Sequence, residues 1–396
     1  MSKVLAINSG SSSLKFQLFE MPQEETITSG IVERIGLDDA IFTIKVNGEK
    51  ISKILPVKDH KVGVHLVLEA LIEHKILNNL EEIDAVGHRV VHGGEHYNHS
   101  VLFNEEVYNN LVALNEFAPL HNPANLMGYQ TFKELLPNVP HTAIFDTAFH
   151  QTMKEEFFVY PMPYEFYEKY KVRKYGFHGT SHLYVSRRVA ELMGKKPEEI
   201  NVITLHLGSG ASIAAVQNGK CVNTSMGFTP LAGIMMGTRT GDVDPSTIPF
   251  LMEKLGKSAS EIIDIFNKQS GLKGISGTSG DARDVQQGVD KNDHRSILAQ
   301  QMFSNRVIQT IGEYFVQMGR VDAIVFTGGI GENDPIMREL ILEKCKEALQ
   351  ITYNKELNAN IRGKETLLSL NDSKVQVWLI PTNEELVIAR DAYTNI

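Results

Sequence analysis

A chain of 396 residues is too long for one ordinary hydrophobic core, and it predicts two domains of roughly 150 to 200 residues. Its composition, with 42% hydrophobic and 22% charged residues, is that of a globular protein and excludes a disordered or fibrous one. The formal net charge of -9 argues against a general binder of nucleic acid or membrane surfaces, so we expect neither partner.

The chain begins with two apolar runs, residues 4–9 and 14–19, that flank Gly10 and three serines. Both runs alternate as β-strands do. A glycine-serine loop after a strand usually leads into a helix that binds phosphate at its N-terminus. Because a strand follows here instead, we predict a hairpin that holds a polyphosphate together with a second, facing hairpin. An ordinary Gly-Ser turn is the alternative.

The rest of the first half alternates between helical and strand patterns, as in an α/β sheet. We predict helices at 62–77, 105–117 and 123–136, and strands at 83–91 and 141–146. Asn122, directly before Pro123, is predicted to cap the third helix. We place the domain boundary between residues 149 and 172. The domains are then 1–149 and 150–384, with a C-terminal helix at 385–396 that rejoins the first domain.

The second half repeats the opening pattern. Residues 202–217 are again strand, Gly-Ser-Gly and strand, followed by an Asn218-Gly219 turn of the hairpin type. Gly208 lies half a chain length after Gly10, which hints at a duplication. We also predict a helix at 296–318 and a strand at 323–326. The third glycine-rich turn, FTGGIGEND, matches neither the dinucleotide fingerprint nor the P-loop.

The chain resembles the acetate kinase family, of the sugar kinase, Hsp70 and actin superfamily, in motifs that run in family order. The motifs are VLAINSGSSSLKF, GHRVVHGG, FDTAFH, YGFHGTSH, HLGSGAS, GTRTGDVDP and TGGIGEN. The resemblance implies two duplicated α/β domains of the actin-like ATPase (ribonuclease H-like) type, with an active-site cleft between them. It also implies magnesium-dependent, reversible phosphoryl transfer between ATP and acetate, which gives ADP and acetyl phosphate and links acetate to acetyl-CoA metabolism.

By this resemblance five residues serve the transfer itself, namely Arg89, His121, Asp146, His178 and Arg239. The two arginines can clamp acetate and the moving phosphoryl group bidentately, and His178 would hydrogen-bond a phosphoryl oxygen. Acetate is already ionised at neutral pH, so a general base has little to do. We therefore expect Asp146 to orient Arg89, Arg239 or metal-bound water. His121 follows a predicted helix, and a helix-ending or capping role is the alternative.

The resemblance also implies the nucleotide contacts. The phosphates would lie against Ser11, Ser13, Lys15, His206, Leu207, Gly208, Ser209 and Gly210. The ribose and adenine would lie against Asp281, Ala282, Arg283, Gly329, Ile330, Gly331, Glu332 and Asn333. Small residues there let a flat base approach the backbone.

A metal and an acyl pocket complete the implied site. Mg²⁺, for which Mn²⁺ can substitute, would be held by Asn8 and Glu384, although these residues also fit a strand-end turn and a helix start. Arg89 would bind the acetate carboxylate. The acetate methyl group would lie in a hollow of Val91, Leu120, Phe177 and Pro230, all of which read equally well as core residues.

Two other functions remain open at this point. A propionate or butyrate kinase would use the same machinery with a roomier acyl pocket, and an actin- or chaperone-like ATPase would share the hairpins.

The resemblance further implies a homodimer. Cys221 and Cys345 lack metal-binding spacing, so we expect reduced, buried thiols in a cytoplasmic protein.

Overall fold

The computed structural model describes residues 1–119 and 121–396. The chain divides into two compact units, which we call the first unit (Met1–Phe149 with Asn383–Ile396) and the second unit (His150–Thr382). Each unit is built on one β-sheet with helices packed against it, which confirms the predicted α/β class. In the part of the chain described, every helix is too short or too polar to cross a membrane.

The sheet of the first unit has the strand order β5-β4-β3-β2-β1-β6-β8-β7. The predicted opening hairpin is confirmed as β1 (Ser2–Ser9) and β2 (Ser13–Met21), which pair antiparallel. Strand β6 (Ile83–Val90) runs parallel to β1, and β8 (His141–Phe145) runs parallel to β6. The other strands are β3 (Glu25–Glu33), β4 (Ala40–Val46), β5 (Glu49–Leu55) and β7 (Val101–Leu102).

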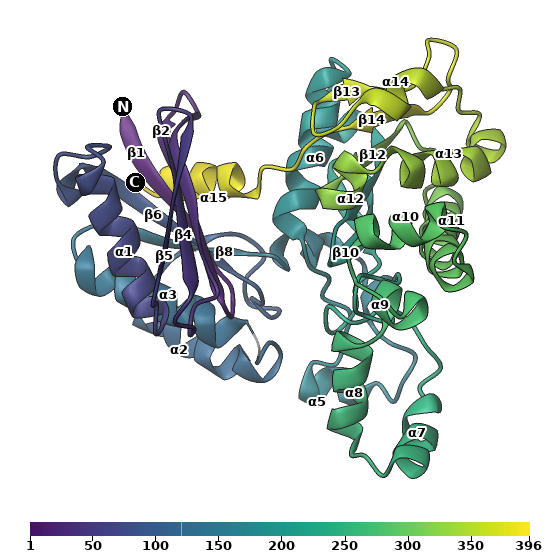
Figure 1. The fold of residues 1–396 in the computed structure, drawn as a ribbon, viewed down its shortest axis with the longest axis horizontal. Helices are drawn as coiled ribbons and strands as arrows, with labels where there is room; N and C mark the ends of the chain where they lie inside the picture. Colours follow the sequence, from purple (N-terminus) through teal and green to yellow (C-terminus); the bar gives the residue numbers. More distant parts are fainter. Residues whose placement is uncertain (120) are drawn as a thin grey trace. The chain divides into compact units, whose positions relative to one another are not determined.

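Helices cover both faces of this sheet. The helices are α1 (His60–Glu73), α2 (Glu105–Ala113), α3 (Asn122–Leu135) and α15 (Glu384–Tyr393). Val86 and the side chains of α1 and α3 share one apolar core. Its neighbour Gly87 faces the other side of the sheet, where α15 packs (Figure 1). A Cβ atom at Gly87 would lie 2.5 Å from Ile388 Cγ2, so only glycine lets α15 approach β6 this closely.

The sheet of the second unit has the order β11-β10-β9-β12-β14-β13. Strands β9 (Asn201–Leu207), β10 (Ala211–Gln217) and β11 (Lys220–Thr224) form an antiparallel meander, with β12 (Ala323–Thr327) and β14 (Gln376–Leu379) parallel beyond it. The strands β3-β2-β1-β6-β8 of the first unit follow the same plan. The predicted duplication of a ribonuclease H-like sheet is thereby confirmed. Edge strand β13 (Thr366–Leu367) completes the sheet.

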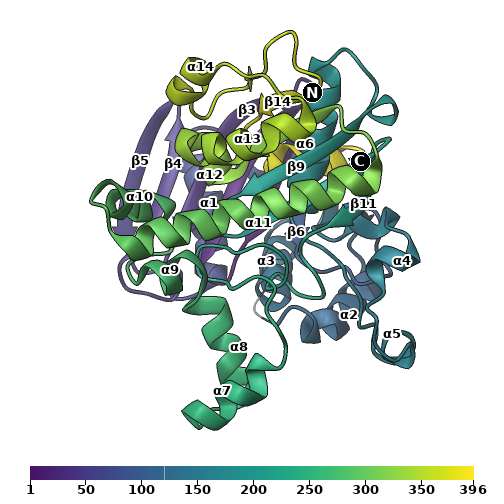
Figure 2. The ribbon, with the colours of Figure 1, turned by 90° about the vertical axis from the view of Figure 1, so that its right-hand side faces the viewer.

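The predicted hairpin turn at Asn218-Gly219 is confirmed, because both residues have positive φ, 52° and 76°. The longest helix, α11 (His294–Met318), runs across this unit and packs on β9 and β10 (Figure 2). The other helices of the unit are α4 (Glu155–Phe158), α5 (Glu165–Tyr170), α6 (Gly179–Leu192), α7 (Thr247–Leu255), α8 (Ala259–Lys268), α9 (Gly271–Ser276), α10 (Ala282–Asp290), α12 (Gly328–Asn333), α13 (Pro335–Leu349) and α14 (Lys355–Asn360).

Some predicted boundaries in the first unit were wrong. Helix α1 begins two residues early because Asp59 caps it, accepting a hydrogen bond from the Val62 N–H at 2.9 Å. The helix predicted at 105–117 ends at Ala113 and continues as a short 3₁₀ turn. Asn122 is not the cap of α3: His121 occupies that position without a capping side-chain bond, and the Asn122 amide binds elsewhere.

Candidate active site

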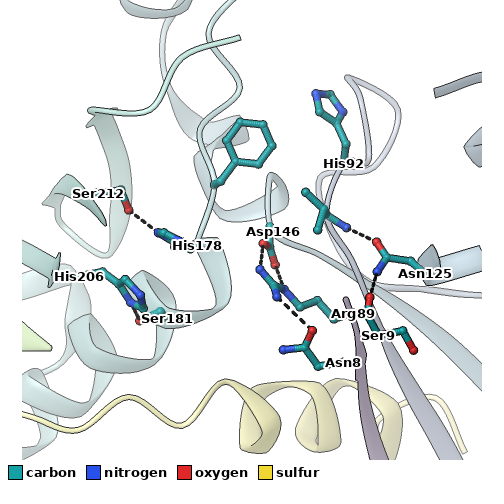
Figure 3. Close-up of polar contacts among 12 residues, drawn as sticks. Asn8, Ser9, Arg89, His92, Asn125, Asp146, His178, Ser181, His206 and Ser212 are labelled. Carbon is teal, nitrogen blue, oxygen red and sulfur yellow. Dashed lines mark hydrogen bonds and ion pairs between the residues drawn. The ribbon is translucent and has the colours of Figure 1, made fainter. Parts of the chain in front are cut away.

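In the first unit, three predicted residues meet at the carboxyl ends of neighbouring parallel strands (Figure 3). Arg89, on β6, donates from Nε and Nη2 to the two carboxylate oxygens of Asp146, at 2.8 and 2.5 Å. Its Nη1 donates to Asn8 Oδ1 at 3.0 Å. Asp146 directly follows β8, and Asn8 lies near the end of β1. Ligands of open α/β sheets bind at this edge of the strands.

The charge of Arg89 is strongly stabilised. Burial disfavours the guanidinium, but the charge and hydrogen bonds of Asp146 outweigh it and raise the pKa of Arg89, with help from Glu384 and Glu385. Asp146 is only 1% exposed, whereas the Arg89 side chain keeps 20% exposure. The bidentate pair therefore presents a fixed guanidinium edge, and Asp146 contacts Arg89, one of the partners that the sequence left open.

Helix α15 adds two acidic residues to this region. Glu384, its first residue, is half-buried, and burial together with the negative charges of Asp146 and Glu385 raises its pKa to about 7, against the pull of Arg89. Lys15 Nζ forms an ion pair with Glu385 Oε1 at 2.7 Å. A carboxylate that is hard to ionise beside other acids fits a bound cation, because a divalent ion would relieve the repulsion.

Two buried asparagines, neither of them predicted as a site residue, hold the chain after β6. The Asn122 amide accepts from the His92 N–H and donates to the His92 carbonyl, both at 3.1 Å. The Asn125 amide accepts from the Val91 N–H at 3.0 Å and donates to the Ser9 carbonyl at 2.5 Å (Figure 3). Asn125 thus links Ser9, the residue after Asn8, to Val91, the residue before His92.

The first glycine-serine loop connects β1 to β2. Ser11 is exposed and Ser13 half-buried. The Gly10 N–H donates to the Ser13 carbonyl at 2.8 Å, and the Gly10 carbonyl accepts from His60 Nε2 at 2.6 Å. His60, at the start of α1, is therefore a support of this loop that lies too far along the chain to be found from the motif.

In the second unit, His178 lies at the start of α6 with a left-handed backbone, φ 55°. Its ring stacks on His206 at a centroid distance of 4.2 Å, and its Nδ1 lies 2.9 Å from Ser212 Oγ (Figure 3). A Cβ atom at Gly210 would lie 3.6 Å from His178 Nε2 and 3.5 Å from Arg239 Nη1. The second glycine-serine hairpin thus brings the predicted histidine and arginine to one place.

Arg239 is a guanidinium without a counter-charge. Its Nη1 donates to the Pro230 carbonyl at 3.2 Å, and burial lowers its pKa. Across residues 1–119 and 121–396, no acidic side chain forms an ion pair with it. A desolvated, unneutralised arginine beside a histidine is suited to receive an anion.

A cavity of about 780 Å³ opens beside the same hairpin. Eight predicted nucleotide residues line it: Gly208, Ser209, Asp281, Ala282, Arg283, Gly329, Ile330 and Asn333. Eight lining residues were not predicted: Gly280, Gln286, Asp334, Pro335, Ile336, Glu339, Ala359 and Arg362. Apolar side chains such as Ile330 and Ile336 can flank a flat base, and the polar ones can bind its edges and the ribose.

Three further predicted nucleotide residues of the second unit, Glu332, Leu207 and His206, do not line this cavity. The Glu332 carboxylate accepts from the Gly328 N–H at 2.9 Å and from the Thr382 N–H at 3.1 Å. Leu207 is fully buried in the sheet. His206 Nδ1 lies 2.7 Å from Ser181 Oγ.

Arg338, fully buried on α13, was missed by the sequence analysis although it ties two walls of the cavity together. It donates to the Gly331 carbonyl on α12 at 2.9 Å. It also donates to the side chain and carbonyl of Asn358 on α14 and to the carbonyl of Ile361, which follows α14. A single arginine on a helix reads as a surface residue in sequence, and only the fold shows it buried.

The predicted methyl hollow is described in part. Val91 follows β6 in the first unit and is 6% exposed, while Phe177 is 2% exposed in the second unit. Pro230 accepts the Arg239 bond, and Leu120 lies outside the described residues. Among the described residues, no three His, Cys, Asp or Glu side chains gather in a way that could hold a metal ion.

Comparison with known proteins gives consistent matches over the whole chain. The family model described as the acetokinase family matches residues 3–390. The acetate kinase of Anoxybacillus flavithermus is 55% identical over 99% of this chain and 98% of its own length, and that of Macrococcus caseolyticus is 53% identical over 100% and 99%.

Solved structures agree with these matches. The crystal structure of Porphyromonas gingivalis acetate kinase is similar with a TM-score of 0.94 and 44% identity, covering 100% of this chain and 99% of that one. A propionate kinase from Francisella tularensis has a TM-score of 0.93 and 41% identity, covering 100% of both chains.

Proposed function

This chain belongs to the acetokinase family, and from that premise we propose that it transfers a phosphoryl group reversibly between ATP and acetate. The observation that carries the proposal is the hairpin at residues 208–210. Gly208 and Ser209 line the large cavity, and Gly210 lies against His178 and Arg239. A nucleotide in the cavity would thus point its phosphates at an uncompensated guanidinium and an imidazole.

Transfer of a phosphoryl group depends on positioning and on positive charge around its three equatorial oxygens. Arg239 would supply such a charge. Its guanidinium is buried and forms no ion pair with a carboxylate among the described residues, so a bound phosphoryl group would be the group that neutralises it. His178, whose Nε2 also lies beside Gly210, would donate a hydrogen bond to an oxygen of the phosphoryl group. The base and ribose would lie among the cavity residues, including Asp281, Gly329 and Asn333.

The first unit is proposed to hold acetate. Arg89 faces the carboxylate with an edge that Asp146 orients, so no proton need be removed from the substrate. Val91 would pack on the methyl group, together with Leu120, Phe177 and Pro230. His121, at the cap position of α3, would add a polar group nearby. We propose that both units act on one reaction, in the cleft that the family resemblance implies.

Mg²⁺ belongs to this proposal. Asn8 Oδ1 and the Glu384 carboxylate are oxygen ligands of the kind that such an ion prefers. Burial and the charges of Asp146 and Glu385 raise the pKa of Glu384, and a divalent ion would offset both effects. When bound, the ion would neutralise charge on the phosphates. We further propose a cytoplasmic homodimer, on the resemblance alone.

The test is acyl phosphate formation. The protein is mixed with ATP, Mg²⁺ and acetate, propionate or butyrate, and the product is trapped with hydroxylamine as a hydroxamate. We expect the highest kcat/KM with acetate, because the relatives at 53 to 55% identity are named acetate kinases. A clear preference for propionate would favour the activity named for the Francisella relative, and ATP hydrolysis without hydroxamate would contradict any carboxylate kinase.

A further inference from the structure

The YGFHGTSH motif contains a second histidine that the proposed transfer does not use. His182 lies in the first turn of α6, four residues after His178, which occupies the N-terminal cap position of that helix. His182 is fully buried, as are Thr204 on β9 and Ser212 on β10. Buried polar groups of this kind must find hydrogen-bond partners inside the protein.

These side chains form a continuous chain of hydrogen bonds. His178 Nδ1 lies 2.9 Å from Ser212 Oγ, and the same hydroxyl lies 2.8 Å from His182 Nε2. His182 Nδ1 lies 2.7 Å from Thr204 Oγ1. The Thr204 hydroxyl in turn donates to the Ala214 carbonyl at 3.5 Å. A buried hydroxyl, a buried imidazole and a second buried hydroxyl thus connect the backbone of β10 to His178.

The carbonyl end sets the direction of the protons. A carbonyl only accepts, so the Thr204 hydroxyl gives its proton to Ala214 and accepts from His182 Nδ1–H. Burial, together with His150 and His206, keeps the pKa of His182 well below its usual value, so this ring is neutral. Its Nε2 then carries a lone pair and accepts from the Ser212 hydroxyl. Ser212 Oγ is left as an acceptor for His178.

We propose that Thr204, His182 and Ser212 are positioning residues that hold a proton on Nδ1 of His178. The chemical consequence rests on the proposed function. Neutral His178 with its proton on Nδ1 has no proton on Nε2, the nitrogen on the side of Gly210. It can donate from Nε2 only as the imidazolium. The ring therefore meets a phosphoryl group as a second positive charge beside Arg239, not as a neutral donor.

The decisive experiment reads the tautomer directly. Histidine nitrogens are isotopically labelled in the full chain, and nitrogen NMR at a pH where His178 is neutral identifies which nitrogen is protonated. His178→Gln assigns the signal. We expect Nδ1 to carry the proton in the native chain. Upon addition of ATP, we expect His178 to show protons on both nitrogens.

The remote variant Thr204→Val provides the sharpest test, because it keeps the shape of the side chain and does not touch His178. Without the Thr204 hydroxyl, the His182 proton should move to Nε2, the Ser212 hydroxyl should turn to His178 Nδ1, and the His178 proton should appear on Nε2. Ser181→Ala is the matched control: it removes a hydroxyl from the same helix that contacts His206, and it should leave the His178 tautomer unchanged.

Two results would overturn the proposal: a proton on Nε2 of neutral His178 in the native chain, or an unchanged His178 tautomer in a folded Thr204→Val variant. If the Thr204→Val variant is not stably folded, the His178 tautomer is measured in Ser212→Ala instead. This variant removes the hydroxyl that accepts from His178 Nδ1, so the proton should no longer be held on that nitrogen. These spectra need no turnover, so they remain valid if the enzyme fails to make acyl phosphate. If it does make it, Ser212→Ala should lower kcat about tenfold with little change in the KM for ATP.

Discussion

Arg89 and Asp146 lie 57 residues apart in the chain, yet they share two parallel hydrogen bonds of 2.8 and 2.5 Å. The pairing follows from topology, because β6 and β8 are parallel neighbours and their carboxyl ends meet. Asp146 thus fixes the plane of the Arg89 guanidinium, and we propose that the carboxylate of acetate binds in that plane.

Asp146→Asn should therefore weaken the use of acetate. The amide keeps the shape but removes the charge and one acceptor, and hydrogen bonds to a charged group are worth ~1.5–3 kcal/mol. We expect kcat/KM for acetate to fall by about 10- to 100-fold. Glu134→Gln, at an exposed ion pair with Lys61, is the control and should leave the kinetics unchanged. Wild-type kinetics in Asp146→Asn would show that the pair has no part in the reaction.

Arg239→Ala should separate catalysis from stability. Loss of a group that neutralises transition-state charge commonly lowers kcat by about 10²–10³-fold. The melting temperature should stay the same or rise, because burial already disfavours this charge and no acid compensates it. Arg320→Ala, at a largely exposed side chain, serves as the control. A large drop in melting temperature with near-normal kcat would make Arg239 a structural residue.

Glu384→Gln should change the magnesium requirement and the stability in opposite senses. The pKa of Glu384 is raised to about 7 from an ordinary 4.5, so between these values the folded protein holds a proton that the unfolded chain releases. Its contribution to stability is thus lost as the pH rises from about 4.5 towards 7. At pH 8 the glutamine variant should be more resistant to urea than the native chain, and a magnesium titration of its activity should be shifted to higher concentration. An unchanged titration would remove Glu384 from the metal site.

The buried pair His88 and His141 should make the protein sensitive to acid. His141 Nε2 donates to the Leu136 carbonyl, and His88 Nε2 lies 2.9 Å from His141 Nδ1. One of the two facing nitrogens must accept, so at least one ring is neutral. Burial lowers the pKa of His141 to about 4 and that of His88 well below its usual value. The two neutral rings make their full contribution to the free energy of unfolding above about pH 6.5. This contribution is lost as the pH falls towards 4, because in that range the unfolded chain takes up protons on these histidines and the folded protein does not.

Urea unfolding at pH 7.5 and pH 5 measures this loss. His141→Gln, which cannot titrate, should lose less stability between the two pH values than the native chain. An equal loss in both proteins would assign the acid sensitivity to other groups.

The sequence motifs predicted most of the candidate site residues, but not the residues that hold them in place. The two glycine-serine hairpins, which include Gly208, were predictable because each loop is flanked by alternating apolar runs. His178 and Arg239 were predicted from the family motifs YGFHGTSH and GTRTGDVDP. Asn122 was misread because an asparagine before proline fits a helix cap, whereas its partner His92 lies on the chain after a different strand. Ala359 and Arg362 reach the cavity, and Arg338 reaches the Gly331 carbonyl beside it, only through folding, and no local pattern marks them.

In the proposed reaction, the terminal phosphoryl group of ATP moves to an oxygen of acetate. Phosphorus NMR of the protein with ATP, Mg²⁺ and acetate follows donor and product in one sample. We predict equal growth of ADP and acetyl phosphate, no inorganic phosphate beyond the slow hydrolysis of acetyl phosphate, and regeneration of ATP when acetyl phosphate and ADP are supplied instead. Growth of ADP and inorganic phosphate at the same rate with and without acetate would contradict phosphoryl transfer to acetate.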